Sequence, residues 1–247
     1  FLDITPPSDV APENYLVEES QLAAYTIRYY TDNFPSLNSL YGDDEMATDN
    51  ATTRNSSNRY LIGEWKTPAS GGEWNFNNIY TLNYFIQSTE KNLETGSIKG
   101  NSTNIKHYIG EGYFLRAYQY FYRLRKLGDF PIIKEVLPDN KEALVEASKR
   151  QPRNEVARFI LQDLDKAIEY LTNNPDGGKA RITKNAALVL KARVALFEAT
   201  WEKYHAGTAL VPNGKGWPGA EKDYNKGYQF PSGSPEAEVN FFLDQAI

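Results

Sequence analysis

Several acids and two histidines are the first candidates for chemistry in this chain. Glu111 lies in a dense aromatic segment, about 140° around a helix from Arg116 at ~100° per residue, so we expect its carboxylate to point inward. A buried carboxylate needs a partner or a shifted pKa. It could act as a catalytic acid, but structural ion pairs also bury acids. We interpret Glu111 as a structural carboxylate held by an arginine or by backbone amides.

The remaining polar groups form no catalytic or metal-binding pattern. His107 and His205 are the two histidines, too far apart in sequence for a local metal pair or base. Four acids lie close together, at Asp43, Asp44, Glu45 and Asp49. Their oxygens could hold a hard cation, but they lack the spacing and central glycine of a calcium loop, which favours a solvated acidic surface. We therefore predict no catalytic residue, no metal and no cofactor.

Composition narrows the function classes further. The chain has no cysteine, which excludes disulfides, thiolate metal sites and cysteine nucleophiles. Its 32 acids and 27 bases give a net charge of -5, which argues against a nucleic-acid partner. The apolar runs are shorter than the ~20 residues of a membrane span. The 17 tyrosines, 12 phenylalanines and four tryptophans are numerous enough that some rings must lie at the surface, as contact platforms, unless they fill helix interfaces.

Two long loops carry many of these aromatic residues. Residues 36–76 are polar but include Tyr60, Trp65 and Trp74, which are costly to leave loose in water. A loop of this length in a compact domain is usually functional, so we expect it to be ordered and functional. Residues 213–234 form a second loop, in which Trp217 is a further candidate contact residue.

The elements that must position these residues are helices. The aromatic segment from His107 is predicted to be the central helix and to end near Leu127, because Gly128 suits the turn after a helix and Pro131 prevents continuation. A stripe of small and polar residues runs along it and is expected to face water: Gly112, Arg116, Gln119, Arg123 and Lys126.

Apolar periodicity and capping residues predict the other helices at 14–34, 78–93 and 154–171, then one capped by Thr183 and one opened by Ser234. The segment after Pro131 is expected to be extended. Alanines at the contact and a short turn at 173–178 join two helices into a hairpin of the tetratricopeptide type, without a constant repeat. The predicted fold class is mainly α, with tetratricopeptide-like hairpins and long irregular loops.

Four blocks along the chain resemble the SusD/RagB family of Bacteroidetes outer-membrane lipoproteins. They are FLDITPPS, EGYFLRAYQYFYRLRKLGDFPII, RNEVARFILQDLDKAIEYL and RITKNAALVLKARVALFEA, in the family's order. The resemblance implies a SusD-like α/α fold. Because members of the family are longer, residues 1–247 are expected to be the N-terminal part of one SusD-like domain, with a lipid-bearing cysteine just before the first block.

The same resemblance implies function. A family member is a surface-exposed lipoprotein of the outer membrane, anchored through an N-terminal lipid that lies outside this chain. It captures oligosaccharides for polysaccharide utilisation and delivers them to a SusC-like TonB-dependent transporter, without breaking a bond. The partners expected are therefore a glycan, the transporter and the membrane.

The resemblance also places the ligand site in the first long loop. The residues implied are Asp49, Arg59, Trp65, Trp74, Phe76 and Asn77. A ring stacks on the apolar face of a sugar, while carboxylate, guanidinium and amide groups satisfy its hydroxyls. The family's tryptophan usually precedes a tyrosine by four residues. Here Phe76 has that spacing to Tyr80 and Trp74 is displaced by two, so Trp74 departs from the family pattern. As an alternative to ligand binding, Trp65 and Trp74 could pin the loop to the helices.

Two other functions fit parts of the sequence. A helical glycoside hydrolase would need paired acids ~5–9.5 Å apart, such as Glu73 and Asp49. A tetratricopeptide-type scaffold for peptides would present a concave helical groove lined by polar side chains. The aromatic residues concentrate in the loops, which favours the glycan-binding interpretation.

Overall fold

The computed structural model describes residues 15–34, 62–63 and 74–247. These ranges contain seven α-helices: α1 (Glu19–Asn33), α3 (Asn77–Glu94), α4 (Ser102–Leu127), α5 (Lys141–Ala147), α6 (Arg153–Tyr170), α7 (Lys184–Tyr204) and α8 (Pro235–Ala246). Short 3-10 helices lie at Gly178–Ala180, Pro218–Glu221 and Asp223–Asn225. In the described ranges the only β pairing is two isolated bridges. The mainly α prediction is confirmed.

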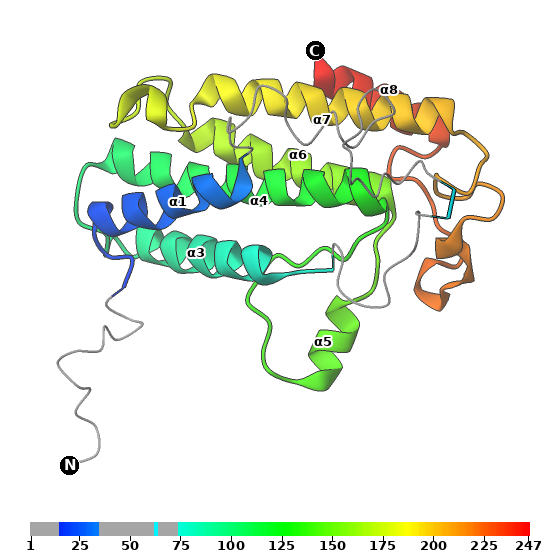
Figure 1. Ribbon diagram of the computed structural model, residues 1–247, viewed down its shortest axis with the longest axis horizontal. Coiled ribbons are helices and arrows are strands. Elements are labelled where there is room, and N and C mark those ends of the chain that lie inside the picture. The colour runs from blue at the N-terminus through cyan, green and yellow to red at the C-terminus, as the bar shows by residue number, and fades with distance from the viewer. Residues whose placement is uncertain (1–14, 35–61, 64–73) are drawn as a thin grey trace.

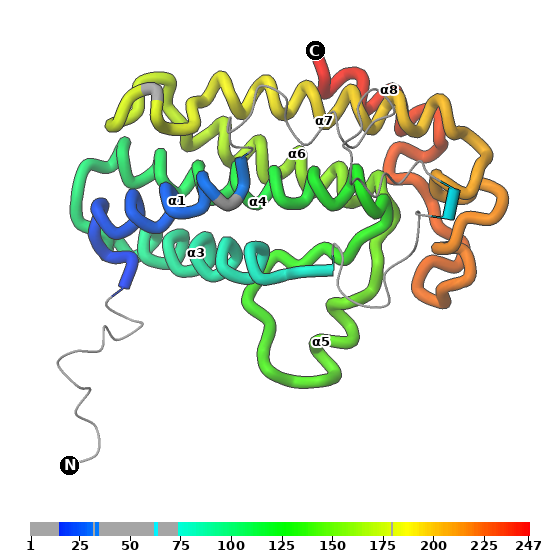
Figure 2. Tube along the Cα trace, in the orientation of Figure 1, coloured from blue at the N-terminus to red at the C-terminus, as the bar shows by residue number. Residues whose placement is uncertain are grey.

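The helix α4 is the centre of the molecule (Figure 1). It packs against α1, α3 and α6, while α7 covers α6 and α8 packs on α7. The tube in Figure 2 shows α6 turning back into α7 through a short connection, which is the predicted hairpin. The α5 helix, which the sequence did not predict, has no buried residue and lies apart from the bundle.

Local signals decide most helix ends. Gly128 follows α4 with a φ of 70°, as predicted, and its N–H donates to Leu124. The hydroxyls of Thr183 and Ser234 cap α7 and α8 by accepting from Ala186 and Ala237. The first helix begins later than predicted, because Leu16 has a positive φ of 62° and Glu18 forms a capping box.

The polar stripe on α4 does not face water, which corrects the prediction. Arg116, Gln119 and Arg123 are buried, and only Lys126 of the stripe is exposed. Gln119 donates to Asn33, and Arg123 donates to Gln119 and to the carbonyl of Asn75. The stripe is polar because its side chains reach partners on neighbouring segments, so a 3.6-residue period alone does not distinguish solvent from buried partners.

Buried ion pairs connect the helices around this core. Arg116 on α4 binds both oxygens of Asp163 on α6, at 2.8 and 2.7 Å. Three further pairs are Arg153 with Glu198, Arg158 with Glu238 and Arg181 with Glu111. Removing one partner of such a pair leaves an uncompensated charge, so each pair constrains how its helices are arranged.

Within the described residues, no helix is long and apolar enough to cross a membrane.

Candidate functional site

An aromatic cluster lies where the chain enters α3. Trp74 and Phe76 precede the helix, and both rings stack on the fully buried Phe130, which follows α4. The ring centroids are 5.3 Å apart for Trp74 and 5.1 Å for Phe76, with interplanar angles of 26° and 14°. Phe130 therefore anchors both rings to the core.

The outer part of this cluster is available to solvent. The Trp74 side chain is 42% exposed, while Phe76 is half-buried. Asn77, the first residue of α3, is exposed. Its backbone N–H donates to the side chain of Asn75 at 2.9 Å. Its side-chain amide has no hydrogen bond within the described part of the chain. Tyr80, one helical turn later, is 53% exposed. A ring and a free amide at one helix start can stack on a sugar and bind its hydroxyls.

A cation from a distant segment completes the cluster. The guanidinium carbon of Arg150 lies 4.6 Å from the Trp74 ring centroid. Two hydrogen bonds of 3.1 Å between the backbones of Phe130 and Gln151 hold this segment beside the ring that supports Trp74. Arg150 forms no ion pair with any residue in the described ranges.

The structure brings together three of the six predicted site residues, Trp74, Phe76 and Asn77. Phe76 packs inward and supports Trp74 more than it offers a surface. The other three, Asp49, Arg59 and Trp65, lie outside the described residues. So do Glu73, the hydrolase candidate, and the acidic cluster at 43–49.

Sequence reasoning missed Phe130 and Arg150. Phe130 lies between Gly128, which ends α4, and Pro131. These two helix-ending residues are a local sequence signal from which an apolar residue packed at the end of α4 could have been predicted. Arg150 had none. It reaches Trp74 only because residue 151 pairs with residue 130.

Glu111 is a structural carboxylate, as predicted. It is fully buried and accepts hydrogen bonds from Thr26 at 2.6 Å, Tyr30 at 2.7 Å and Arg181 at 2.9 Å. His107 lies one turn before it, with Nε2 3.3 Å from Oε1 of Glu111, while its Nδ1 accepts from the backbone N–H of Thr172. All three donors come from other segments, so the carboxylate joins α1 and the loop before α7 to α4.

A cleft of about 290 Å³ lies at the C-terminal end of α4, and Arg150 is one of its lining residues. Trp217 also lines this cleft and donates to Asp129 at 2.7 Å. The backbone N–H of Arg153 donates to the other oxygen of Asp129 at 2.9 Å. Burial raises the pKa of Asp129 above its ordinary value, although both donors oppose that change. Trp217 is buried, which argues against the predicted role as a second contact residue.

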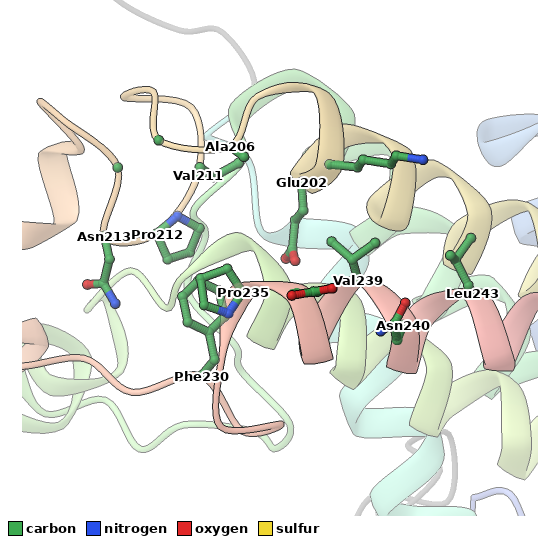
Figure 3. A pocket seen from close by; sticks show the side chains of 14 residues that line it. Glu202, Ala206, Val211, Pro212, Asn213, Phe230, Pro235, Val239, Asn240 and Leu243 are labelled. Carbon is green, nitrogen blue, oxygen red and sulfur yellow. The ribbon is translucent and has the colours of Figure 1, made fainter.

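A second, larger cavity of about 570 Å³ lies between the end of α7 and α8. Figure 3 shows Glu202 pointing from α7 toward α8, among Val211, Pro235 and Val239. Neither oxygen of this buried carboxylate has a hydrogen-bond partner in the described ranges. Burial, together with the charges of Glu198 and Glu238, raises its pKa to about 9. The lining of this cavity is mostly apolar, with Lys203, Glu236 and two asparagines among it, and the described residues of the lining include no exposed ring that could stack on a sugar.

The described residues contain no group of three or more histidine, cysteine, aspartate or glutamate side chains that could hold a metal ion.

Comparisons with known proteins agree on one family. A SusD-like family model, described as "Starch-binding associating with outer membrane", matches residues 1–196. SusD-like protein P2 from Formosa agariphila is 30% identical over 118 residues, which are 48% of this chain and 23% of that protein. The description of the family model names a binding protein and not an enzyme.

Solved structures show the same fold. A SusD-like protein from Bacteroides fragilis NCTC 9343 matches with a TM-score of 0.55 and 26% identity, covering 81% of this chain and 39% of its own. A SusD homolog from Bacteroides thetaiotaomicron VPI-5482 matches with a TM-score of 0.54 at 19% identity, covering 84% and 43%. The chain thus spans less than half the length of these relatives.

Proposed function

The chain belongs to the SusD-like family, and from that premise we propose that it is a non-catalytic glycan-binding protein. It captures oligosaccharides at the outer membrane, with which the family is associated. The proposed ligand surface is the aromatic cluster at the start of α3. A SusC-like TonB-dependent transporter receives the glycan, and an N-terminal lipid anchors the protein to the membrane.

The observation that carries this proposal is the exposed ring of Trp74. Phe130 supports it from the core, which fixes the orientation of the ring before a ligand arrives. Preorganisation of this kind lowers the entropic cost of binding. Asn77 adds an amide with no hydrogen bond in the described ranges, suited to sugar hydroxyls.

Three residues extend the proposed site beyond the described ranges. Trp65 supplies a second ring, while Asp49 and Arg59 supply a carboxylate and a guanidinium for sugar hydroxyls. That residues 1–247 are the N-terminal part of a larger SusD-like domain stays a prediction, consistent with the 39% coverage of the Bacteroides fragilis relative.

A glycan array with the full chain, followed by calorimetry on a bound oligosaccharide, tests the proposal. Trp74→Ala should weaken binding about tenfold, which corresponds to ~1.4 kcal/mol, because the stacking surface is lost. Asn77→Ala and Trp65→Ala should also weaken it. Tyr204→Ala is the matched control, since Tyr204 is 76% exposed on α7 and lies outside the proposed site.

The result would contradict the site if Trp74→Ala and Trp65→Ala both bound as tightly as the wild type. It would contradict the function if no glycan bound at all. Incubation with a polysaccharide panel separates binding from hydrolysis: released product from the pure chain would support the hydrolase alternative with Glu73 and Asp49.

A further inference from the structure

We propose that the glycan bound at Trp74 is acidic, and that Arg150 binds a carboxylate or sulfate group on it. This inference rests on the glycan-binding function proposed above and specifies the ligand class at the same site. Arg150 is the geometric link, because it lies against the Trp74 ring and also lines the cleft at the end of α4. A ligand bound at Trp74 would therefore lie beside this cation.

The cleft is basic although the chain as a whole is acidic. Four basic side chains and one acid line it: Arg125, Lys126, Arg150, Arg153 and Asp129. The chain has a net charge of -5, so this concentration of positive charge is local and not a general property of the surface. Such a local field attracts anions.

Two of these five charged groups, Arg153 and Asp129, are already bound to partners inside the protein. Arg153 is buried and binds both oxygens of Glu198, at 2.7 and 2.8 Å. Asp129 accepts from Trp217 and from the backbone of Arg153, so its oxygens are already used. The acid therefore does not neutralise the other three cations by direct contact.

The remaining three cations are exposed and form no ion pair in the described part of the chain. Arg125 lies over Phe121 and Lys126 over Tyr122, at 5.1 and 5.8 Å from the ring centroids. Arg150 lies over Trp74 in the same way. Contacts with aromatic faces orient these three cations, and their positive charges are not paired with a carboxylate of any described residue.

Arg150 is suited to discriminate acidic from neutral sugars. A guanidinium binds a carboxylate or a sulfate through two parallel charge-assisted hydrogen bonds, which are about twice as strong as neutral ones. The bridge between Phe130 and Gln151 fixes the backbone next to Arg150, which reduces the conformational entropy that this segment loses when a ligand binds. The cleft volume of about 290 Å³ is at the lower end of ligand sites, which suits one charged sugar unit beside the ring.

Paired oligosaccharides that differ only in charge provide the test. Calorimetry on the full chain would compare an oligogalacturonide with its methyl ester, and a sulfated galactan oligosaccharide with its desulfated form. We expect at least one acidic form to bind tenfold or more tightly than its neutral counterpart, and Arg150→Ala to remove most of that difference. The pair that responds identifies the carboxylate or the sulfate as the group bound.

Arg193→Ala is the matched control, because Arg193 is exposed on α7 and does not line the cleft. Circular dichroism of both variants verifies that they fold. Equal affinity for charged and neutral forms would overturn the inference and leave the glycan-binding function intact. So would an acidic preference that Arg150→Ala does not change. If the wild type binds no oligosaccharide of either kind, the proposed function fails together with the inference.

Discussion

Glu111 illustrates at the residue scale why a buried acid need not be catalytic. Its carboxylate accepts from Thr26, Tyr30 and Arg181, so its capacity as an acceptor is used by the fold itself. A general acid or base needs a pKa and a free position suited to a substrate. Glu111 has no exposed surface from which it could reach one.

Glu202 is a different kind of buried acid, because no donor in the described ranges compensates it. Its pKa is raised from 4.5 to about 9. The folded state therefore favours the protonated form. Below pH 4.5 the group is protonated in both states and imposes no pH-dependent penalty, whereas between pH 4.5 and about 9 the unfolded state is favoured increasingly and the stability of the fold falls as pH rises.

We predict that Glu202→Gln stabilises the protein at pH 8 and has little effect at pH 4.5. Glutamine keeps the shape of the side chain and cannot ionise. Because pH 8 lies about 3.5 units above the unfolded pKa of 4.5 and below the folded value, the gain at pH 8 should be at most about 5 kcal/mol, at ~1.4 kcal/mol per pKa unit. Urea unfolding at the two pH values measures it. Glu94→Gln, at an exposed position on α3, is the control. A gain of the same size at both pH values would contradict the prediction.

At the element scale, the packing of α3 on α4 depends on a glycine. A Cβ atom added to Gly112 would lie 2.7 Å from the Phe85 ring, much closer than normal contact. Phe85 is fully buried and stacks on Tyr25 with ring centroids 4.8 Å apart, so it cannot move freely. Gly112 therefore sets the distance between the two helices.

We predict that Gly112→Ala destabilises the fold by roughly 1–2 kcal/mol. Overpacking costs ~1–3 kcal/mol, and the better helix propensity of alanine returns ~1 kcal/mol at most. The free energy of unfolding in urea measures the net effect. In a Phe85→Leu background the same substitution should cost much less, because the ring is gone. An equal cost in both backgrounds would show that the contact with Phe85 is not the cause.

At the scale of the whole molecule, long-range ion pairs join the helices in series. Arg116 links α4 to α6, Arg153 links α6 to α7, and Arg158 links α6 to α8. In the last link, Glu238 is fully buried and also accepts from Asn154 and from the backbone of Ser232. Burial opposes ionisation of Glu238, but these hydrogen bonds outweigh it and lower its pKa.

We predict that Glu238→Ala loosens α8 and costs roughly 2–4 kcal/mol at pH 7, somewhat less than a fully buried pair because Arg158 retains some exposure. Since the pKa of Glu238 is lowered, its contribution is present above the unfolded value of 4.5 and is lost as pH falls through the folded value. The difference between variant and wild type should therefore shrink at acidic pH.

Hydrogen exchange followed by mass spectrometry measures the local effect. Amide protection should fall in α8 before it falls in α4. Glu236→Ala is the control, because Glu236 is exposed in the first turn of the same helix. Uniform loss of protection across the molecule would argue that the pair supports the whole core and not α8 in particular.

The sequence predicted the helical scaffold well because its signals are local. Gly128, Thr183 and Ser234 act within one helical turn, through a positive φ or a hydroxyl cap. The start of α1 was misplaced because the turn at Leu16 has no recognisable turn residue. The α5 helix was missed because it is only seven residues long, too short for an apolar period to be recognised in the sequence.

The candidate site could be predicted only in part. Trp74, Phe76 and Asn77 are close in sequence, so one resemblance located all three. Phe130 and Arg150 join them through packing between segments that are distant in sequence. No local pattern encodes that proximity.

Local signals in the sequence predicted most of the helices and their ends, because hydrogen bonding within a turn and apolar periodicity act over a few residues. The resemblance of four sequence blocks, and not periodicity, indicated the SusD-like family. The directions of the polar side chains, in contrast, depend on how the helices pack in three dimensions. The tertiary structure turned the stripe at Arg116 and Arg123 inward, gave Glu111 its donors and placed Arg150 against Trp74. Such contacts depend on partners from other segments, and a one-dimensional pattern does not identify those partners before the chain is packed.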